Sequence, residues 1–589
     1  MSRPIAAIRQ PPARRRHLAR TTACAALIAG AATGAALTGA GSAAAHPAAS
    51  PDLSFHTMWT ASFPSDTHVF ALSSPVIAQL PNGPAVVAGD RSGHVYAIYL
   101  TPGPEGAPST AWTVTTRGPD GPVGVDSSPS SLDGVVYFGI GWAGIKGVGG
   151  YEAINSNGSR KWFEYAVNPP TDPTPDAGVA AGLTIGSLQS QTAVVGPSLG
   201  QNTYVFNAAS GARLKGFPWY QADTNFSTAA VADVEGNGQN QIIEGGNTSA
   251  GVAYGKTYVN GGQIRILNET GTNGGEPNAG LYCEYQTDQG IDSSPAVGEI
   301  LNGQPGIVVG TSTERSGVTT TDDVIAVDNS CHRVWQATLD GATTSSPALA
   351  DVLGNGQLQV VEGTEGGWVY ALDSLNGSVH WKTKVDGEVI GGVVTADLGG
   401  GYQDVIVPST TGCYILDGKT GDIVATLEDT IALQNSPLVT DDPDGTIGIT
   451  VAGESAAGGA HAAMEHFEVV GSNGSVVSEA GSWPEFHHDA RLSGDANVPQ
   501  ADNLAVTTTS LPSGTVGHAY SATVTAGGGV TPYVWSRTSG SRPPGLTFAS
   551  NGTWSGTPTA AGSYSFVVQV TDAELTRVSK TLTITVASG

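Results

Sequence analysis

The chain has 589 residues, with 51 acidic and 25 basic side chains and a formal charge of −26 at pH 7. Six arginines precede the first acidic residue, so a chain without that basic segment carries 19 basic against 51 acidic residues, a charge of −32. Such a chain lacks the basic patch that DNA or RNA binding requires, which excludes nucleic-acid ligands. The 81 glycines and 35 prolines disfavour long helices, and the length indicates roughly two to four domains.

Residues 1–45 have the composition of an export signal peptide. Arginines at 14–16 precede an apolar run of small residues, and alanines at 43–45 form a cleavage site. The general secretory route and the twin-arginine route both remain open. No later stretch reaches about 18 apolar residues, so we expect no membrane span and a secreted, extracellular protein.

A Ser-Ser-Pro motif recurs through most of the chain and divides it into repeats. Four full copies, one near copy and three degenerate copies give eight anchors with a mean spacing of about 52 residues. Each anchor is followed by a short strand, a Gly/Asn turn, an apolar strand that ends on glycine, and further strands, several of which contain tryptophan. Four short strands per repeat are typical of a β-propeller blade. We therefore predict an all-β protein in which residues 55–495 form an eight-bladed propeller, with seven blades as the alternative.

One repeat carries a family resemblance. Residues 371–381, Ala-Leu-Asp-Ser-Leu-Asn-Gly-Ser-Val-His-Trp, resemble the tryptophan-docking repeat of quinoprotein-type eight-bladed propellers, A-x-D-x-x-T-G-x-x-x-W. Turns such as Ala232-Asp233 followed by Gly236-Asn237-Gly238 also resemble FG-GAP repeats. These resemblances imply a PQQ-like or FG-GAP-like propeller. They do not imply one function, because the scaffold hosts enzymes, assembly factors and binding proteins alike.

Residues 505–589 form a second module, rich in Thr, Ser, Val and Gly. Leu511-Pro512, Pro544-Gly545-Leu546 and Gly556-Thr557-Pro558 resemble the immunoglobulin-like (cadherin-like) domain of bacterial surface and secreted proteins. The resemblance implies a small β-sandwich of short strands. A short polar linker at 496–504 is predicted to join it to the propeller.

Three cysteines follow the export signal. Cys283 and Cys331 fall near the ends of successive repeats, so they form either a disulfide between neighbouring blades or two buried thiols. Cys413 lies in an apolar strand pattern and is predicted to be in the core.

The loop that begins at Asp233 is a candidate calcium site. Asp233, Glu235 and Asn237 offer oxygen ligands at alternating positions with glycine at the bend, as calcium loops do. Gln241 stands where the last carboxylate of an FG-GAP calcium loop belongs, which favours the alternative of an ordinary Asp/Asn/Gly turn.

A polar ring is the second candidate site. The second residue of each well-formed anchor is a serine that recurs once per repeat, so equivalent positions are expected on a ring near the channel. Such side chains either line a polar binding mouth or stabilise turns through serine-to-backbone hydrogen bonds. These serines are Ser74, Ser128, Ser294, Ser346 and Ser436.

Signals for catalysis are weak. The vicinal cysteine pair of quinoprotein dehydrogenases is absent, and no adjacent Asp-Asn metal set is evident, so we expect no pyrroloquinoline quinone. Residues 196–200 match G-x-S-x-G, but they lie between two strands and are predicted to form a hairpin turn. His487 and His488 are neighbours that would point to opposite faces of a strand, which disfavours metal binding.

The sequence therefore favours a secreted, monomeric binding or scaffold protein without enzymatic activity. Its propeller and immunoglobulin-like module would contact an extracellular polysaccharide or a surface protein. The alternative is an extracellular enzyme that uses the propeller funnel, either quinone-dependent or active on polysaccharide. A funnel with two converging carboxylates of raised pKa would favour the enzyme.

Overall fold

The computed structural model describes residues 53–589 except 64–69, 119–120, 142–148, 167–177, 221–222, 254–255, 273–278, 313–321, 429–430, 456–461, 471–481, 498–504, 507, 509, 528–532 and 572–576. The predicted export signal at 1–45 and most of the predicted linker at 496–504 lie outside the described residues. Within them, no helix is long and apolar enough to cross a membrane.

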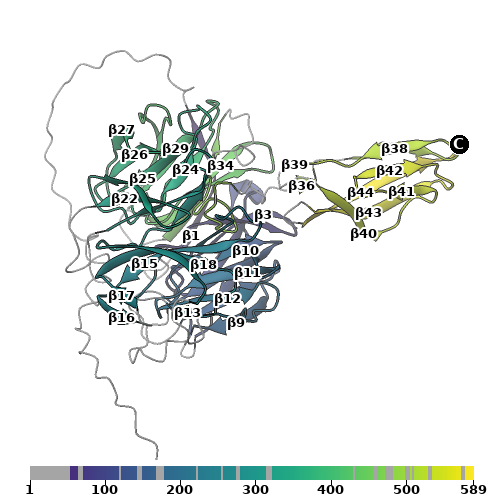
Figure 1. Ribbon diagram of the computed structural model, residues 1–589. Helices are drawn as coiled ribbons and strands as arrows, with labels where there is room; N and C mark the ends of the chain where they lie inside the picture. The colour runs from purple at the N-terminus through teal and green to yellow at the C-terminus, as the bar shows by residue number, and fades with distance from the viewer. Residues whose placement is uncertain are drawn as a thin grey trace, which may run out of the picture.

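The larger body is a β-propeller built from about eight antiparallel sheets (Figure 1). Seven of these sheets, as far as the chain is described, have four strands that follow one another in chain order. Sheet one contains β2 (Val76–Leu80), β3 (Gly83–Gly89), β4 (His94–Tyr99) and β5 (Ser109–Thr115), and sheet two contains β6 (Ser130–Leu132), β7 (Val135–Ile140), β8 (Gly150–Ile154) and β9 (Arg160–Tyr165). Sheet three contains β10 (Thr184–Leu188), β11 (Gln191–Pro197), β12 (Asn202–Asn207) and β13 (Trp219–Tyr220). Sheet four contains β14 (Ala230–Ala232), β15 (Gln241–Thr248), β18 (Gly261–Asn268) and β19 (Leu281–Thr287).

Sheets five to seven repeat the pattern. They are β20 (Ala296–Gly298), β21 (Gly306–Gly310), β22 (Asp323–Asp328) and β23 (Arg333–Thr338); β24 (Ala348–Ala350), β25 (Gln359–Gly363), β26 (Trp368–Asp373) and β27 (Val379–Lys384); and β28 (Val394–Ala396), β29 (Asp404–Ser409), β30 (Gly412–Leu416) and β31 (Ile423–Glu428). A hairpin of β16 (Gly251–Ala253) and β17 (Lys256–Tyr258) and a 3-10 turn, η3 (Pro104–Gly106), lie in loops.

The closing sheet joins the two ends of the propeller sequence. It contains β32 (Ile431–Ala432), β33 (Leu438–Asp441), β34 (Ile447–Ser455) and β35 (Ala462–Val469), and β1 (Phe55–Phe63) pairs antiparallel with β35. Phe55 pairs with Val469 and Phe63 pairs with Ala462. A strand from the start of the chain thus completes a sheet from its end, which protects an edge that would otherwise be exposed.

Strand position explains the sequence pattern within a sheet. The second and third strands are covered on both faces, so β25 is buried throughout and reads as a continuous run, Gln-Val-Val-Glu-Gly. The fourth strand is the outer edge, so in β27 Trp381 is buried whereas Val379, His380 and Lys382 are exposed. The hydrophobic core lies between the faces of adjacent sheets.

The tryptophans near the ends of the repeats join neighbouring sheets. Trp335 of sheet five donates from Nε1 to the Ser374 carbonyl of sheet six at 2.7 Å, and Trp381 of sheet six donates to the Gly418 carbonyl of sheet seven at 2.7 Å. Gly377 has φ +72°, and a Cβ there would lie 2.7 Å from Trp335 Cε3. The turn therefore needs glycine for both its conformation and the close approach of the ring.

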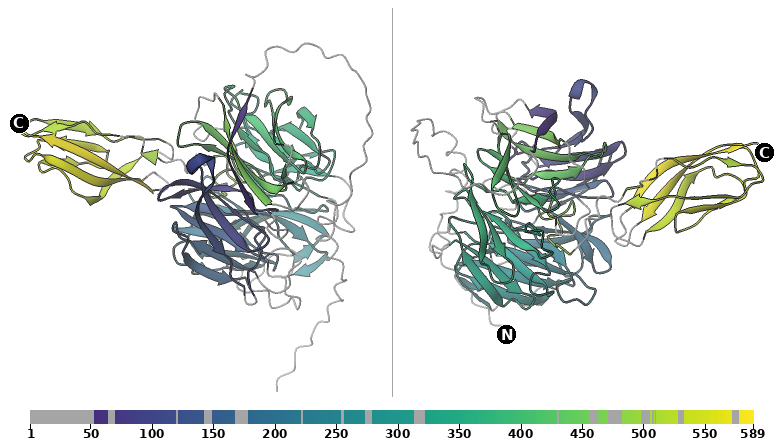
Figure 2. Two further views of the ribbon diagram at one scale, coloured as in Figure 1. Left: turned by 180° about the vertical axis from the view of Figure 1, so that it is seen from behind. Right: turned by 90° about the horizontal axis from the view of Figure 1, so that it is seen from above.

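Residues after 504 form a separate β-sandwich that projects from the side of the propeller (Figures 1 and 2). Trp535, Trp554 and Phe566 are buried at its centre, and the Trp554 and Phe566 rings lie 4.5 Å apart. Its strands are β36 (Ala505–Val506), β37 (Gly514–Thr515), β38 (Tyr520–Thr523), β39 (Ala526–Gly527), β40 (Val534–Gly540), β41 (Leu546–Phe548), β42 (Thr553–Gly556), β43 (Gly562–Thr571) and β44 (Arg577–Ala587).

Candidate functional site at the centre and rim of the propeller

The five anchor serines lie where neighbouring sheets meet. The Ser74 amide donates to Ser128 Oγ at 3.0 Å, and the Ser294 amide donates to Ser346 Oγ at 3.0 Å. The Ser436 amide of the closing sheet donates to Ser74 Oγ of sheet one at 3.1 Å, across 362 residues of sequence. All five side chains are buried, and those of Ser74, Ser128, Ser294 and Ser346 accept backbone amides of a neighbouring sheet, so these contacts stabilise the ring of sheets.

The first serine has a different role in three of the four full anchors. Ser73, Ser127 and Ser293 each accept a hydrogen bond at Oγ, 3.0 Å long, from the glycine amide that ends the second strand or lies within it. The Ser73 hydroxyl also donates to the Ser127 carbonyl of the next sheet at 2.9 Å, so both serines of this anchor contribute to the contact between sheets. Sequence analysis recognised the Ser-Ser repetition only as a marker.

Residues 482–497, which we call the plug, run around the centre of the propeller. The plug hydrogen-bonds to the innermost strands of six sheets in ring order: sheets seven, closing, two, three, four and five. The bonds join Thr395 N to Trp483 O, Val439 N to Pro484 O, Ser131 N to Ala490 O, Ile185 N to Arg491 O, Val231 N to Ser493 O and Val297 N to Gly494 O, at 2.6–3.0 Å.

The plug is buried along most of its length. Trp483 is 2% exposed and packs with the core of sheets five to seven, and Ala490 packs with the core around sheet one. Asp489 is fully buried and accepts at Oδ1 from the amides of Arg491 and Ser493. The centre of the propeller is therefore filled by this chain's own residues.

His487 and His488 lie in a tight turn of the plug. Their φ angles are +58° and +85°, so they are not in the strand that sequence analysis assumed. The two ring nitrogens of His487 face the carbonyls of Leu492 and Pro295 at 2.7 and 2.9 Å. Burial lowers the pKa of His487, and burial lowers the pKa of His488 to about 4.

The Asp233 loop is a hydrogen-bonded turn. Both carboxylate oxygens of Asp233 accept backbone amides, from Asn237 at 3.1 Å and Gly238 at 2.6 Å, and Gln241 Oε1 accepts the Val234 amide. The Asn237 side-chain amide donates to Glu235. These oxygens are directed at N–H donors instead of a common centre, so the three predicted ligands do not fit a calcium site.

A second loop supports this interpretation. Asp351 accepts the amides of Asn355 and Gly356 at 2.9 and 2.7 Å, although Leu353 replaces the third-position ligand. The same geometry thus forms where a calcium ligand is missing. Within the described residues, no group of three or more His, Cys, Asp or Glu side chains is arranged to hold a metal.

A carboxyl group with a raised pKa lies beside a second carboxylate in sheet seven. Burial and, to a smaller extent, the negative charge of Asp417 raise the pKa of Asp404 to about 7. Asp417 accepts the Tyr402 hydroxyl at 2.5 Å and caps the turn at Lys419. Because these contacts hold the turns of one sheet, the pair does not supply the convergent acids that an enzyme funnel requires.

The closing sheet contains a network that sequence analysis missed. His466 Nε2 lies 2.8 Å from Asp442 Oδ2, and His466 Nδ1 lies 2.9 Å from Thr450 Oγ1. The order of groups is that of a catalytic triad, but His466 and Thr450 are completely buried and Trp59 stacks on the imidazole at 5.4 Å. The network therefore joins β1 to the closing sheet, and periodicity gave no signal for it because its members lie on separate strands.

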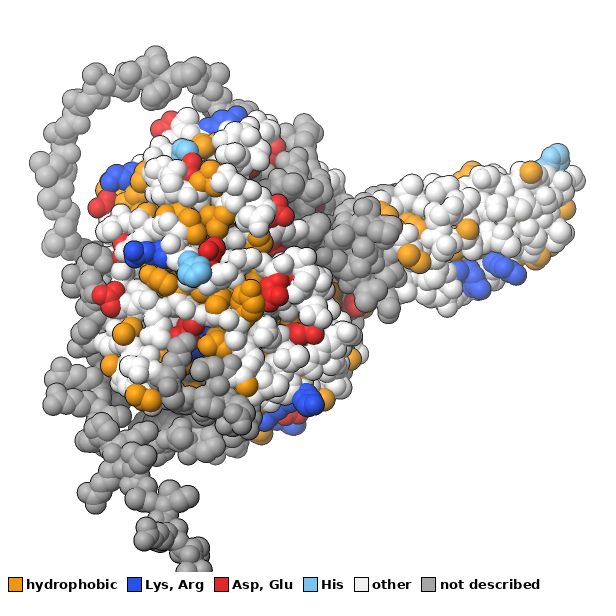
Figure 3. Space-filling model, viewed as in Figure 1, with side chains coloured by type: hydrophobic (Ala, Val, Ile, Leu, Met, Phe, Trp, Pro, Cys, Tyr) orange, Lys and Arg blue, Asp and Glu red, His pale blue; other side chains and the backbone are white. Residues whose placement is uncertain are grey.

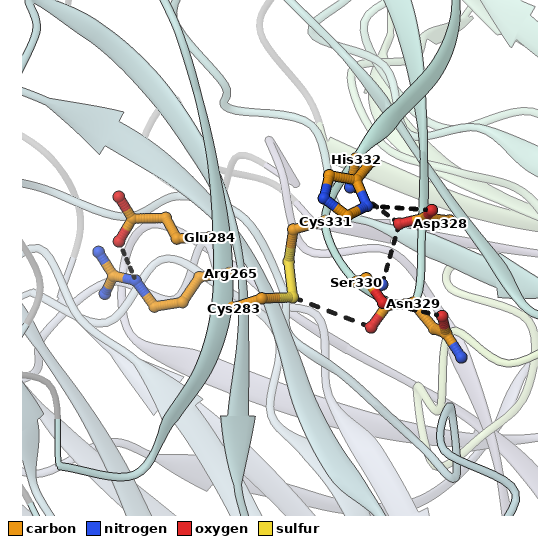
Figure 4. Close-up of a disulfide and its surroundings, with 8 residues drawn as sticks. All are labelled: Arg265, Cys283, Glu284, Asp328, Asn329, Ser330, Cys331 and His332. Carbon is orange, nitrogen blue, oxygen red and sulfur yellow. Dashed lines mark hydrogen bonds and ion pairs between the residues drawn. A yellow bond between two sulfur atoms is a disulfide. The ribbon is translucent and has the colours of Figure 1, made fainter.

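The structure joins Cys283 and Cys331 in a disulfide, with Cα atoms 5.8 Å apart (Figure 4). Cys283 pairs with Ile266 as Trp335 pairs with Ala326 one sheet later, and Cys331 has φ +60° in the turn where Gly377 occurs in sheet six. The disulfide thus replaces the tryptophan–glycine contact between sheets four and five. Cys413 is buried in the core as a free thiol.

The outer edge of the propeller exposes hydrophobic side chains on four consecutive sheets. Tyr282, Val334, Val379 and Ile423 are 42–50% exposed on β19, β23, β27 and β31. We call these four residues the rim band. A hollow of about 370 Å³ adjoins Val334 and is also lined by Leu301 and Leu375. Hydrophobic and uncharged side chains dominate the face in Figure 3.

Comparison with known proteins agrees with this architecture. Residues 503–587 match the family described as "Putative Ig domain". No curated protein matches the chain. Among solved structures the chain is similar to BamB from Moraxella catarrhalis, with 15% identity, a TM-score of 0.43, and coverage of 70% of this chain and 100% of that chain.

Two further structures are similar at the level of fold. Quinohemoprotein alcohol dehydrogenase from Comamonas testosteroni is 13% identical, with a TM-score of 0.34 and coverage of 66% of each chain. The V. cholerae biofilm matrix protein Bap1 is 12% identical, with a TM-score of 0.38 and coverage of 74% of this chain and 94% of that chain. The chain thus combines a β-propeller that resembles BamB and the quinohemoprotein enzyme with a C-terminal immunoglobulin-like domain.

Proposed function

We propose that this protein is a secreted binding or scaffold protein without enzymatic activity, which contacts an extracellular polysaccharide or a surface protein. The observation that carries the proposal is the plug. Catalytic sites of propeller enzymes need a cavity that the substrate can enter and in which reactive groups converge. Here the corresponding space contains mostly buried, hydrogen-bonded residues of the chain itself, from Trp483 to Asp495.

The proposal includes an eight-bladed closed ring. Its support is the series of serine contacts between neighbouring sheets, which returns from Ser436 to Ser74, and the pairing of β1 with β35. A ring of this kind is rigid, because each sheet is held by its two neighbours. Rigidity suits a scaffold, since little order is lost when a ligand binds.

The rim band is the surface that we assign to ligand contact. The four residues occupy the outer strands of consecutive sheets, and exposed hydrophobic surface that recurs in this way is the kind that marks interaction sites. Exposed charged residues lie beside the band, such as Arg333 next to Val334 and Lys382 on the strand of Val379, so contact would combine apolar and polar groups. The immunoglobulin-like module, which follows the C-terminal end of the plug, would extend the reach of the protein.

The test presents the full secreted chain to an array of purified extracellular polysaccharides and surface proteins. We expect retention on at least one ligand, with no release of reducing sugar and no reduction of a redox dye above a heat-denatured control. Val334→Asp combined with Val379→Asp is expected to reduce retention at least tenfold. Val252→Asp, at a position that is 71% exposed outside the rim band, is the matched control and is expected to bind normally.

Product formation on any ligand would contradict the absence of enzymatic activity. Retention on none of the ligands would contradict the binding function. An equal loss from both aspartate variants would contradict the assignment of the rim band.

A further inference from the structure

The inner edges of the sheets require a partner. The first strand of each sheet lies nearest the centre and pairs with the second strand on one side only. On its other side, its N–H groups have no neighbouring strand within the sheet. Buried amides without acceptors are costly, about 1–3 kcal/mol each. In six sheets the plug supplies the missing carbonyl, for example Arg491 O for Ile185 N at 2.8 Å.

The plug also carries the side chains that an independent peptide ligand would need. Trp483 and Leu492 are 2% and 1% exposed, and Trp483 packs with the core of sheets five to seven, whereas Leu492 lies against Gly182 before sheet three. Main-chain bonds to sheet edges combined with side chains in pockets are the contacts by which edge strands bind extended peptides.

The plug is at the same time the connection between the two modules. Its last residue, Asn497, accepts the Glu299 amide at its side chain, and Ala496 N donates to Val297 O at 2.8 Å. The described part of the immunoglobulin-like module begins at Ala505, only a few residues later.

We infer that the centre of the propeller is a peptide-binding site, and that it holds the C-terminal module without needing the covalent chain between residues 470 and 482. The occupant is residues 482–497 of this chain. The immunoglobulin-like module is therefore attached through a non-covalent joint, and a chain cut before residue 482 remains one particle. The inference does not depend on the proposed function, because the joint can hold whether or not the rim band binds a ligand.

The experiment uses two full-length variants, each with an inserted site for a sequence-specific protease. One site lies between residues 474 and 475, before the plug, and the other lies between residues 500 and 501, after it. Cutting removes the tether that keeps two segments at a high effective concentration, so only the contacts of the plug can then hold the fragments together.

We expect the variant cut before the plug to elute from a sizing column as one particle at micromolar concentration and to separate in denaturant. The variant cut after the plug should release the immunoglobulin-like module at once. Release of the module after the first cut, in native buffer, would overturn the inference. Retention after the second cut would also overturn it, because the module would then be held by contacts outside the plug.

A pair of aromatic variants identifies the contacts of the joint. In the background of the first cut, Trp483→Ala is expected to weaken the association of the fragments roughly 100-fold or more. Phe486→Ala is the matched control, since Phe486 is an aromatic residue of the plug that is only half-buried, and it should change the association by less than tenfold. Equal effects would show that the association does not depend on the burial of Trp483. The unsubstituted cut chain keeps the inference testable if Trp483→Ala does not fold.

Discussion

At the scale of single residues, the turns of the propeller depend on glycines with a left-handed backbone. Gly377 and Gly356 both have left-handed backbone angles, φ +72° and +79°. They differ in surroundings, because a Cβ at Gly377 would meet the Trp335 ring whereas a Cβ at Gly356 would have no atom within 4 Å. The two glycines therefore separate the effect of backbone strain from the effect of docking.

We predict that Gly377→Ala lowers the free energy of unfolding by more than Gly356→Ala does. Left-handed strain costs about 1–2 kcal/mol in each variant. Displacement of the Trp335 ring adds about 1–3 kcal/mol to the first alone. Urea unfolding measures both variants, and equal losses would show that Trp335 does not depend on close contact with the glycine.

A second prediction at this scale concerns the pH dependence of stability. Burial, followed by the charge of Asp417, raises the pKa of Asp404 from 3.8 to about 7. The folded state therefore binds this proton more tightly than the unfolded state does. The stabilisation is complete below pH 4 and is lost as the pH rises through 7.

We predict that Asp404→Asn removes this part of the pH dependence. The variant should match the parent near pH 4 and exceed its free energy of unfolding by about 4 kcal/mol at pH 8. Asp422→Asn, at an exposed position nearby, is the control and should follow the parent at all pH values. A variant that keeps the parent's slope between pH 4 and 8 would contradict the assignment to Asp404.

At the scale of elements, neighbouring sheets are joined by equivalent contacts of different chemistry. Trp335 and Trp381 dock on turn glycines, whereas sheets four and five use the Cys283–Cys331 disulfide at the corresponding place. The disulfide closes a loop of 48 residues in the unfolded chain. Restricting a loop of that length stabilises the folded state.

Replacing both cysteines, Cys283→Ser with Cys331→Ser, is therefore predicted to lower the free energy of unfolding by about 2–4 kcal/mol. Urea unfolding in the presence and absence of a reducing agent provides the control. Reduction should bring the parent close to the double variant and leave the double variant unchanged. A parent that is insensitive to reduction would contradict a stabilising disulfide.

The repeats allowed the arrangement within each sheet to be predicted, because turn glycines and buried strands follow from local pattern. The disulfide could be predicted only as one of two alternatives, since spacing places the two cysteines in neighbouring sheets but does not show that their sulfur atoms meet. The Asp442–His466–Thr450 network was not predicted, because its hydrogen bonds join three separate segments of the closing sheet. Repetition identified the anchor serines as equivalent, but their buried contacts with the next sheet depend on the packing of the ring.

At the scale of the whole molecule, the plug fills the centre of the propeller and connects it to the immunoglobulin-like module. Sequence analysis assumed a strand at His487 and His488. The segment has no periodicity of its own, because its conformation follows the circle of inner strands that it contacts. Its position was therefore beyond prediction from local pattern, although it is the feature that most restricts function.

The most direct test of a filled, cofactor-free centre is thermal unfolding of the full chain with EDTA, with Ca²⁺, and with Ca²⁺ plus pyrroloquinoline quinone. A ligand that binds only the folded state raises the midpoint by mass action. We predict the same midpoint in all three conditions. A rise with the quinone would show an accessible cofactor site and contradict the account of the plug, and a rise with Ca²⁺ alone would contradict the assignment of the Asp233 loop as a metal-free turn.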